Sequence, residues 1–400
     1  MGNYLLTGGK NECCGCGACA QKCPEKAIKM CKDENGFLYP HIEEEKCVDC
    51  KVCYSTCPFA DLGYIYNQSL DIPEVYMVQH KDYETLKKST SGGAFTAIAE
   101  TFCNEKYAIF GATFDENMVV RHTYTSDKRE LHKFNGSKYV QSDVGECYKQ
   151  AEALLKEDKK ILFSGTPCQI AGLRSYLKKE YDNLLCVDLI CHGVPSPLML
   201  EKYIRYLESK HGQKVKYISF RDKTKYGWLL PCTRIDFVSS RSSNYHLTAD
   251  DPYEKIFLSN IALRGSCYSC KFTKFRRVGD LTIGDFWGAE ILYPKINNKN
   301  GLSLVLINTD KGQRIFDHIR CFALCKKSDI SSVSQENKTL IRPTVKHKQR
   351  SAFYKDLHNM EFDKLIKKYC LSRPVYIRAL SVLLSPKAKR WIRKCILTGE

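Results

Sequence analysis

Two stretches near the start of the chain share one cysteine spacing: Cys13-Cys-Gly-Cys-Gly-Ala-Cys-Ala-Gln-Lys-Cys-Pro24 and Cys47-Val-Asp-Cys-Lys-Val-Cys-Tyr-Ser-Thr-Cys-Pro58. This spacing lets a tight turn bring three thiolates onto three irons of one [4Fe–4S] cube, while the fourth reaches a neighbouring cluster. Zinc sites with four cysteines are the alternative. Because both copies end in Cys-Pro, the pattern favours two [4Fe–4S] clusters.

The interleaved ligation assigns each motif's last cysteine to the other motif's cluster. One predicted cluster therefore has the ligands Cys13, Cys16, Cys19 and Cys57, and the other has Cys47, Cys50, Cys53 and Cys23. Cys14 and Cys31 fall outside the pattern and are expected to be spare thiols. Residues 1–65 contain too few apolar runs to fold on a hydrophobic core alone, so bound metal must contribute to the stability of this part. We expect a bacterial-type dicluster ferredoxin domain there, with a hairpin formed by residues 27–32 and 36–40.

The whole chain has 400 residues, of which 43% are hydrophobic and 22 are cysteines. Its length indicates more than one domain. No signal peptide opens it and no run of about 18 apolar residues is present. We therefore expect a reducing, cytoplasmic setting in which the cysteines are metal ligands or buried thiols rather than disulfides.

Residues 75–325 alternate apolar strand-like runs with helical patterns. Strands are expected at 107–112, 161–164 and 184–190, and helices at 144–155 and 170–177. This alternation predicts βαβ units in a mixed or parallel sheet, and an α+β or α/β fold overall. Residues 215–310 are richer in strands.

Residues 326–400 form the third expected region, a basic and mostly helical extension. An irregular segment is expected at 326–350 and helices at 353–369 and 375–397. Of the net charge of +17, +12 lies in residues 321–400. The end of the chain combines these cations with apolar residues such as Trp391, a composition that suits an anionic membrane surface at the inner face or an acidic redox partner. A solvated basic helix is equally compatible, and nucleic-acid binding is disfavoured because no such motif accompanies the charge.

Several segments of the middle region together resemble the family of coenzyme F420 hydrogenase/dehydrogenase beta subunits. They are Ser89-Thr-Ser-Gly-Gly-Ala-Phe, Gly136-Ser-Lys-Tyr-Val-Gln-Ser, Gly165-Thr-Pro-Cys-Gln, Asp188-Leu-Ile-Cys-His-Gly-Val-Pro-Ser-Pro, Phe220-Arg-Asp-Lys, Cys267-Tyr-Ser-Cys and Gly279-Asp-Leu-Thr-Ile-Gly-Asp-Phe-Trp-Gly. They occur in order over more than half of the chain. The resemblance implies a domain that binds FAD and one more [4Fe–4S] cluster.

The third cluster is also suggested by the residues themselves. Cys168 and Cys191 each follow a predicted strand, and loops after parallel strands meet at one sheet edge. Cys267 and Cys270 add a C-x2-C pair from another loop. Buried structural thiols are the alternative.

Small and polar loop residues are the candidates for holding the flavin. Backbone N–H groups at a helix start can bind a pyrophosphate, and the resemblance places a second loop near the flavin. The candidates are Ser91, Gly92, Gly93, Gly136, Ser137, Lys138 and Tyr139.

Three further residues are candidates for catalysis or charge compensation: His192, Arg221 and Asp285. His192 follows a proposed ligand and could donate a proton near the flavin, although a hydrogen bond to a loop is equally compatible. Surface salt bridges are the alternative for Arg221 and Asp285.

These features favour an iron–sulfur flavoprotein oxidoreductase that couples two-electron flavin chemistry to one-electron transfer. Ferredoxin or another redox protein is the expected partner, and a small molecule or deazaflavin such as coenzyme F420 the expected substrate. Electrons could flow in either direction. A non-catalytic electron-transfer component of a larger complex is the alternative.

Overall fold

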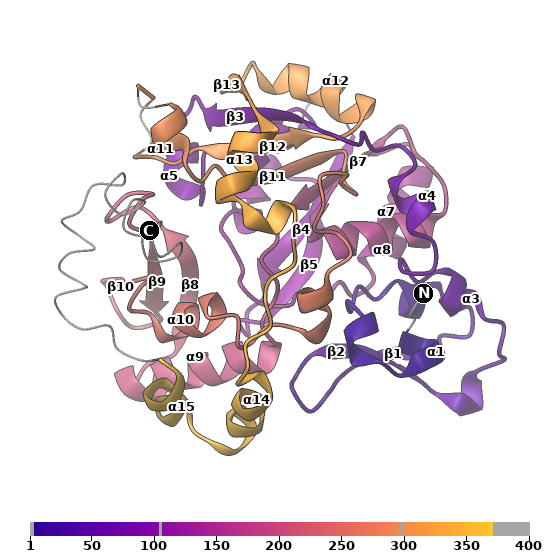
Figure 1. Ribbon diagram of the computed structural model, residues 1–400, viewed down its shortest axis with the longest axis horizontal. Helices are drawn as coiled ribbons and strands as arrows, with labels where there is room; N and C mark the ends of the chain where they lie inside the picture. Colours follow the sequence, from indigo (N-terminus) through magenta and orange to yellow (C-terminus); the bar gives the residue numbers. More distant parts are fainter. Residues whose placement is uncertain (1–3, 104–105, 294, 297–298, 371–400) are drawn as a thin grey trace, which may run out of the picture.

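The structure is a computed structural model and describes residues 4–103, 106–293, 295–296 and 299–370. Its Cys-rich part holds four short helices and one hairpin (Figure 1). These elements are α1 (Tyr4–Thr7), α2 (Ala18–Lys22), β1 (Ile28–Lys32), β2 (Leu38–Ile42), α3 (Val52–Ser55) and α4 (Leu62–Tyr66). The expected hairpin is confirmed: β1 and β2 pair antiparallel, with Ile28 opposite Ile42. Asp33 forms its turn by accepting hydrogen bonds from the N–H groups of Asn35 and Phe37.

An eight-stranded mixed sheet is the centre of the larger part. Its strands are β3 (Glu74–His80), β4 (Tyr107–Phe114), β5 (Val120–Thr125), β6 (Lys160–Gly165), β7 (Leu184–Leu189), β11 (Leu281–Asp285), β12 (Ser303–Ile307) and β13 (Ala323–Ser328). Their order is β13-β3-β12-β11-β7-β6-β4-β5. Strands β4, β6, β7 and β11 run parallel to one another, and the remaining pairs are antiparallel. The mixed α/β fold and the expected strands at 107–112, 161–164 and 184–190 are thereby confirmed.

The central strands of this sheet are buried on both faces and are apolar on both sides, whereas the edge strands β5 and β13 carry exposed residues. Leu162, Leu185 and Val305 belong to the core on one face. Phe163 and Cys186, on the next residues along β6 and β7, face the opposite core. The helices around the sheet are α5 (Tyr83–Lys88), α6 (Ala94–Glu100), α7 (Cys147–Lys156), α8 (Pro167–Leu177), α11 (Ala289–Leu292), α12 (Asp310–Ile319) and α13 (Ile330–Glu336).

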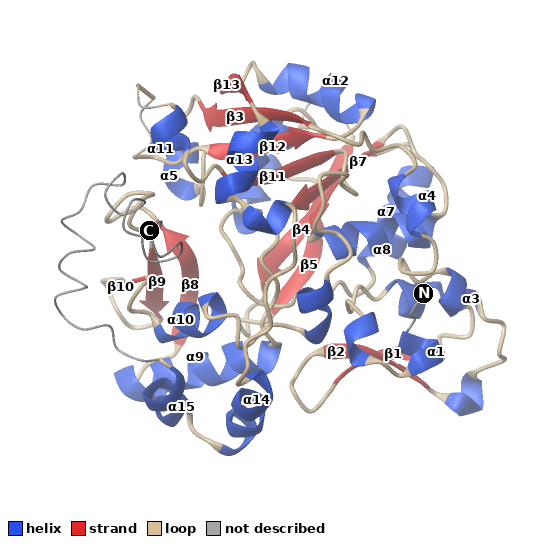
Figure 2. Ribbon diagram, in the orientation of Figure 1, coloured by secondary structure: helices blue, strands red, loops and turns tan. Residues whose placement is uncertain are grey.

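A smaller antiparallel sheet with its own helices lies beside the large sheet (Figure 2). It consists of β8 (Val215–Asp222), β9 (Cys232–Phe237) and β10 (Asn244–Leu247), with helices α9 (Pro197–His211), α10 (Pro252–Leu258), α14 (Arg350–Asn359) and α15 (Phe362–Tyr369). Their side chains share one core that includes Tyr203, Phe220 and Phe353.

The prediction that residues 326–350 are irregular is wrong in part. Strand β13 continues to Ser328, and α13 follows because Asp329 caps it by accepting a hydrogen bond from the N–H of Ser332. The helical expectation at 353–369 is confirmed as two helices, α14 and α15. The expected helix at 375–397 and the basic residues around Trp391 lie outside the described residues. Within the described ranges, no helix is long and apolar enough to cross a membrane.

Candidate iron–sulfur and flavin sites

The four cysteines assigned to the first cluster line one cavity of about 380 Å³. Cys13, Cys16 and Cys19 come from the turn before α2 and from α2 itself, while Cys57 follows α3. The pKa of the Cys19 thiol is raised, first by burial and then by the neighbouring thiols of Cys13 and Cys57. The structure thus brings Cys57 next to the other motif, as the interleaved pattern requires.

The second motif shows the reciprocal arrangement. Burial raises the pKa of Cys53, and the thiols of Cys23 and Cys50 raise it further, so Cys23 lies with this motif. Cys47 and Cys50 are exposed, in contrast to Cys16, which is buried. This end of the Cys-rich part is therefore the one that faces solvent.

The Cys-rich part packs directly on α8 of the larger part. Gly172 makes this contact possible, since a Cβ atom there would lie 2.8 Å from Cβ and 2.9 Å from Sγ of Cys16. Gln21 accepts a hydrogen bond of 2.9 Å from the N–H of Tyr148. Ser175 donates one of 2.8 Å to the carbonyl of Thr56. The two parts are therefore held by backbone-directed hydrogen bonds as well as by packing.

The cysteines predicted for a third cluster line a second cavity of about 740 Å³. Cys168 lies in the first turn of α8, directly after β6, and Cys191 follows β7. Because β6 and β7 are parallel neighbours, both loops lie at the same sheet edge. Cys267 and Cys270 come from the loop that is tied to this edge by the N–H of Arg264, which donates to the carbonyl of Val194. Four thiols from three loops thus converge.

Burial makes these thiols hard to ionise. The pKa of Cys191 is raised well above its ordinary value, first by burial and then by the thiols of Cys267, Cys168 and Cys270. Burial also raises the pKa of Cys270, to about 11. In the described part of the chain, no three His, Cys, Asp or Glu side chains converge as they would around a single metal ion. A [4Fe–4S] cube differs, because each thiolate binds a different iron and the four ligands stand farther apart.

Cys14, which the spacing left as a spare thiol, lies between the two cavities. It lines both of them, together with Gly15 and Phe59. The pKa of Cys14 is raised well above its usual value, first by its hydrogen bond with Cys16. Cys31, the other spare thiol, is exposed on β1. The only signal for Cys14 in the sequence was its position next to the predicted ligand Cys13, because the ligand pattern itself does not use Cys14.

The two loops predicted to hold a flavin lie side by side. The N–H of Ser137 donates to Oγ1 of Thr90 over 3.0 Å, and Nζ of Lys223 donates to the carbonyl of Ser91 over 2.5 Å. The N–H of Gly92 is not free, because it donates to Oγ of Ser303. The expectation of an open N–H cradle before α6 is therefore wrong at Gly92.

The remaining loop residues differ in their surroundings. Gly93 and Gly136 have positive φ angles of 79° and 83°. Lys138 donates to the carbonyls of Lys133 and Asn135, and burial lowers its pKa to about 7. Tyr139 is partly buried, desolvation raises its pKa, and its ring stacks on Phe257 at 4.6 Å. Lys138 is thus occupied within its own loop, whereas Tyr139 lies in the aromatic core of the small sheet.

Arg221 and Asp285 form an ion pair at 3.4 Å between the small and the large sheet. The Arg221 guanidinium lies 4.5 Å from the centre of the Trp287 ring. Its Nη2 atom faces Asp285, while its buried Nε has no hydrogen-bond partner among the residues that the structure describes. Its φ of 61° is unusual for a residue other than glycine and represents local strain. Buried donors in a strained position are typical of a site that binds a polar group.

His192 is separate from this pair. It lines the second cavity, its Nε2 lies 2.7 Å from Oδ1 of Asn260, and its ring meets Phe257 edge-on. Burial lowers the pKa of His192. Because Phe257 also contacts Tyr139, the His192 side chain is linked to the Tyr139 loop through two aromatic rings.

Comparison with known proteins gives similarities in both parts of the chain. Residues 158–332 match the family described as the C terminus of the beta subunit of coenzyme F420 hydrogenase/dehydrogenase. Residues 12–60 match the 4Fe-4S dicluster domain. Among solved structures, the F420-reducing [NiFe] hydrogenase complex from Methanosarcina barkeri has a chain with 16% identity and a TM-score of 0.45, covering 75% of this chain and 92% of that one.

Curated relatives also resemble the chain. A subunit of the F(420)H(2) dehydrogenase of Methanosarcina mazei is 25% identical over 326 residues, which cover 77% of this chain and 82% of the relative. An uncharacterized protein of Methanocaldococcus jannaschii is 28% identical over 205 residues, covering 44% of this chain and 55% of the relative. The chain is thus similar to the beta subunits of coenzyme F420 hydrogenase/dehydrogenase over residues 158–332 and to 4Fe-4S dicluster domains over residues 12–60.

Proposed function

We propose that this iron–sulfur protein is a flavoprotein oxidoreductase that joins two-electron chemistry at FAD to one-electron transfer through three [4Fe–4S] clusters. The second cavity carries the proposal. Four cysteines from three loops line it, and it shares Cys14, Gly15 and Phe59 with the cavity of the first cluster. Two redox centres that share one wall can exchange electrons directly.

The residues of the second cavity fit a [4Fe–4S] cluster. Cys168, Cys191, Cys267 and Cys270 supply four thiols, the number that such a cluster uses. Burial raises the pKa of the Cys191 and Cys267 thiols, so they stay protonated unless a metal displaces the protons. We infer that this set holds the third cluster.

The residues around Arg221 fit a flavin. FAD, when bound, takes up two electrons from an organic molecule and releases them singly. Arg221 supplies the buried donor Nε, which has no hydrogen-bond partner among the described residues. Asp285 holds that guanidinium in place, and Trp287 covers its face. Lys223 adds a second basic group, whose pKa burial lowers to about 7. These residues would bind and orient an anionic planar group.

A deazaflavin is the substrate class we propose, since the relative from Methanosarcina mazei is named as part of an F(420)H(2) dehydrogenase. A ferredoxin or another small redox protein would meet the clusters at the opposite end, where Cys47 and Cys50 are exposed. Arg221 and Asp285 would act at the flavin, and His192 beside the third cluster.

Anaerobic purification with iron and flavin determination tests this proposal. About twelve irons and one flavin per chain are expected. Cys191→Ala should remove about four irons, whereas the matched control Cys31→Ala, at an exposed position outside the pattern, should remove none. About eight irons in the unaltered protein would exclude the third cluster, and a protein without flavin would exclude the catalytic function.

A non-catalytic relay is the second candidate. The exposed Cys47 and Cys50, and Val48 with 64% of its surface exposed, make one end of the Cys-rich part accessible to a partner. Adding reduced deazaflavin to the isolated chain separates the two functions. Reduction of the clusters supports the enzyme, and an absorption spectrum that stays unchanged supports the relay.

A further inference from the structure

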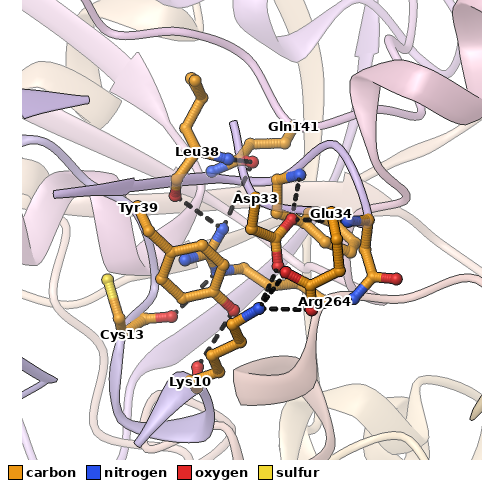
Figure 3. A network of polar contacts seen from close by, with 10 residues as sticks. Lys10, Cys13, Asp33, Glu34, Leu38, Tyr39, Gln141 and Arg264 are labelled. Carbon is orange, nitrogen blue, oxygen red and sulfur yellow. Dashed lines mark hydrogen bonds and ion pairs between the residues drawn. The ribbon is translucent and has the colours of Figure 1, made fainter. Parts of the chain in front are cut away.

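Arg264 lies between the Cys-rich part and the larger part of the molecule, and only 1% of its surface is exposed. Its Nε donates to the carbonyl of Cys13 over 2.9 Å, and its Nη1 donates to the carbonyl of Leu38 over 3.0 Å (Figure 3). The guanidinium stands 3.9 Å from the centre of the Tyr39 ring. The same Nη1 also donates to Oε1 of Gln141 over 3.4 Å.

This cation has no carboxylate partner in the described ranges. Among the residues that the structure describes, Arg264 makes no ion pair, whereas the similarly buried Arg174 pairs with Asp280 at 3.3 Å and Arg277 pairs with Asp188 at 3.0 Å. Burying a charge without a counter-charge is strongly destabilising. The guanidinium does not lose its proton in proteins, so an anion must lie beside it.

The nearest carboxylates of the hairpin do not supply that anion. Asp33 and Glu34, at the turn, bind Nζ of Lys10 instead (Figure 3). Lys10 in turn accepts a hydrogen bond from the hydroxyl of Tyr39 at its carbonyl oxygen. The carboxylates of this network are therefore already neutralised by a lysine on the solvent side.

The anions that remain are the clusters. Arg264 lines the second cavity together with Cys168, Cys191 and Cys267. Its Nη2 is buried and has no hydrogen-bond partner within the described part of the chain. On the other side, its Nε holds the backbone of Cys13, a ligand of the first predicted cluster. A [4Fe–4S]²⁺ core with four thiolates has a charge of about −2, and each added electron makes it more negative.

We propose that Arg264 is the shared counter-ion of two clusters, the one at Cys13, Cys16, Cys19 and Cys57 and the one at Cys168, Cys191, Cys267 and Cys270, and that it raises the reduction potential of both. For the second of these clusters the inference rests on the proposed function. A fixed positive charge stabilises the reduced, more negative state, and its effect is large because the site is buried. Electrons should therefore reside preferentially on these two clusters, which lie on either side of the contact between the Cys-rich part and the larger part.

The remaining predicted cluster, at Cys47, Cys50, Cys53 and Cys23, serves as an internal reference. Its cysteines do not line the cavity that contains Arg264, and Cys47 and Cys50 are exposed, so solvent screens their charge. Its reduction potential should stay constant when Arg264 is changed.

Three variants test the proposal by redox titration with dithionite and mediators, followed by electron paramagnetic resonance. Arg264→Gln removes the charge and should lower the reduction equilibrium constant of the two flanking clusters at least tenfold, which equals about 59 mV for a one-electron couple. Arg264→Lys keeps the charge and should change it less than about threefold. Arg350→Gln is the matched control. Arg350 also donates Nε to a backbone carbonyl, that of Leu263, and lies over a tyrosine ring.

Iron content, measured on every variant, separates the possible failures. A tenfold drop in Arg264→Lys, or unchanged potentials in Arg264→Gln with its full iron content, would overturn the proposal. If Arg264→Gln does not fold, the proposal is tested with Arg264→Lys alone. A changed reduction potential in that variant, which keeps the positive charge, would contradict the proposal. If the unaltered protein holds about eight irons, the third cluster is wrong, and the shift at the Cys13 cluster still supports or refutes the role of Arg264.

Discussion

The packing of Gly172 against Cys16 predicts that Gly172→Ala damages the first cluster rather than the fold as a whole. The new Cβ would lie 2.8 Å from Cβ and 2.9 Å from Sγ of Cys16, and 2.8 Å from Oη of Tyr148. Favourable contacts between carbon atoms lie at about 3.5–4.0 Å, so the two parts must separate by roughly 0.7–1.2 Å. Such overpacking costs about 1–3 kcal/mol.

A second effect of this substitution opposes the first. Gly172 lies inside α8, where alanine is a better helix former by about 1 kcal/mol. The free energy of unfolding should therefore fall by only about 0–2 kcal/mol. The displacement is concentrated on Cys16, however, because its Cβ is fixed to the backbone and cannot turn away. We expect the variant to keep its helical content and to lose about four irons per chain, those of the first cluster.

Iron determination, circular dichroism and anaerobic urea unfolding measure these quantities. Gly63→Ala is the control. Gly63 lies in α4, away from the cysteines, and the nearest atom to a new Cβ there is Oδ1 of Asp61 at 3.3 Å, a milder contact than those at Gly172. A Gly172→Ala protein with the iron content and resonance spectrum of the unaltered protein would refute the tight contact between α8 and Cys16.

Three further predictions follow from the same structure. Cys57→Ser and Cys23→Ser should each reduce cluster occupancy at both motifs, because each cysteine lies with the opposite motif. Iron loss confined to one motif would contradict the interleaved ligation. Arg277→Gln should lower the free energy of unfolding in urea by about 3–5 kcal/mol, since it leaves the fully buried Asp188 without its partner. Burial raises the pKa of the Glu254 carboxyl from 4.5 to about 7. The folded state therefore binds the carboxyl proton more tightly than the unfolded chain does, and the free energy of unfolding falls as pH rises from 4.5 to about 7. The loss is about 3 kcal/mol, and Glu254→Gln should abolish it; an unchanged pH dependence of unfolding in that variant would disprove the assignment.

The elements and the cysteine groups could be predicted from the sequence because they depend on local spacing. Strands β4, β6 and β7 follow from short apolar runs, and the place of Cys168 and Cys191 follows from two successive βα units. The helix α13 was missed because its residues are polar, and only the cap at Asp329 marks its start. Spacing therefore identifies elements with a strong apolar pattern and misses those that a single cap defines.

Arg264 and Cys14 could not be identified in the same way. Arg264 lies three residues before Cys267, but its contacts to Cys13 and Leu38 join residues that are 251 and 226 positions apart. Such contacts arise from the way the Cys-rich part packs on the larger part, which no local pattern encodes. The same applies to Gly92, whose expected role at an anion was replaced by a hydrogen bond to Ser303 on β12.

On the proposed function, the close packing of the Cys-rich part would let three cluster sites and a flavin site work as one chain of centres. A tethered, mobile ferredoxin domain would need no buried hydrogen bonds to its neighbour, yet Gln21 binds the N–H of Tyr148 and the carbonyl of Thr56 binds Ser175. From the second cavity, the rings of His192, Phe257 and Tyr139 follow one another at 5.1 and 4.6 Å toward the small sheet that carries Arg221. Because electron transfer slows steeply with distance, fixed contacts of this kind favour transfer within one molecule over release of a reduced intermediate. On the proposed function, the exposed end at Cys47 and Cys50 is then the position at which a partner exchanges single electrons, and Arg221 marks the position at which electron pairs are handled.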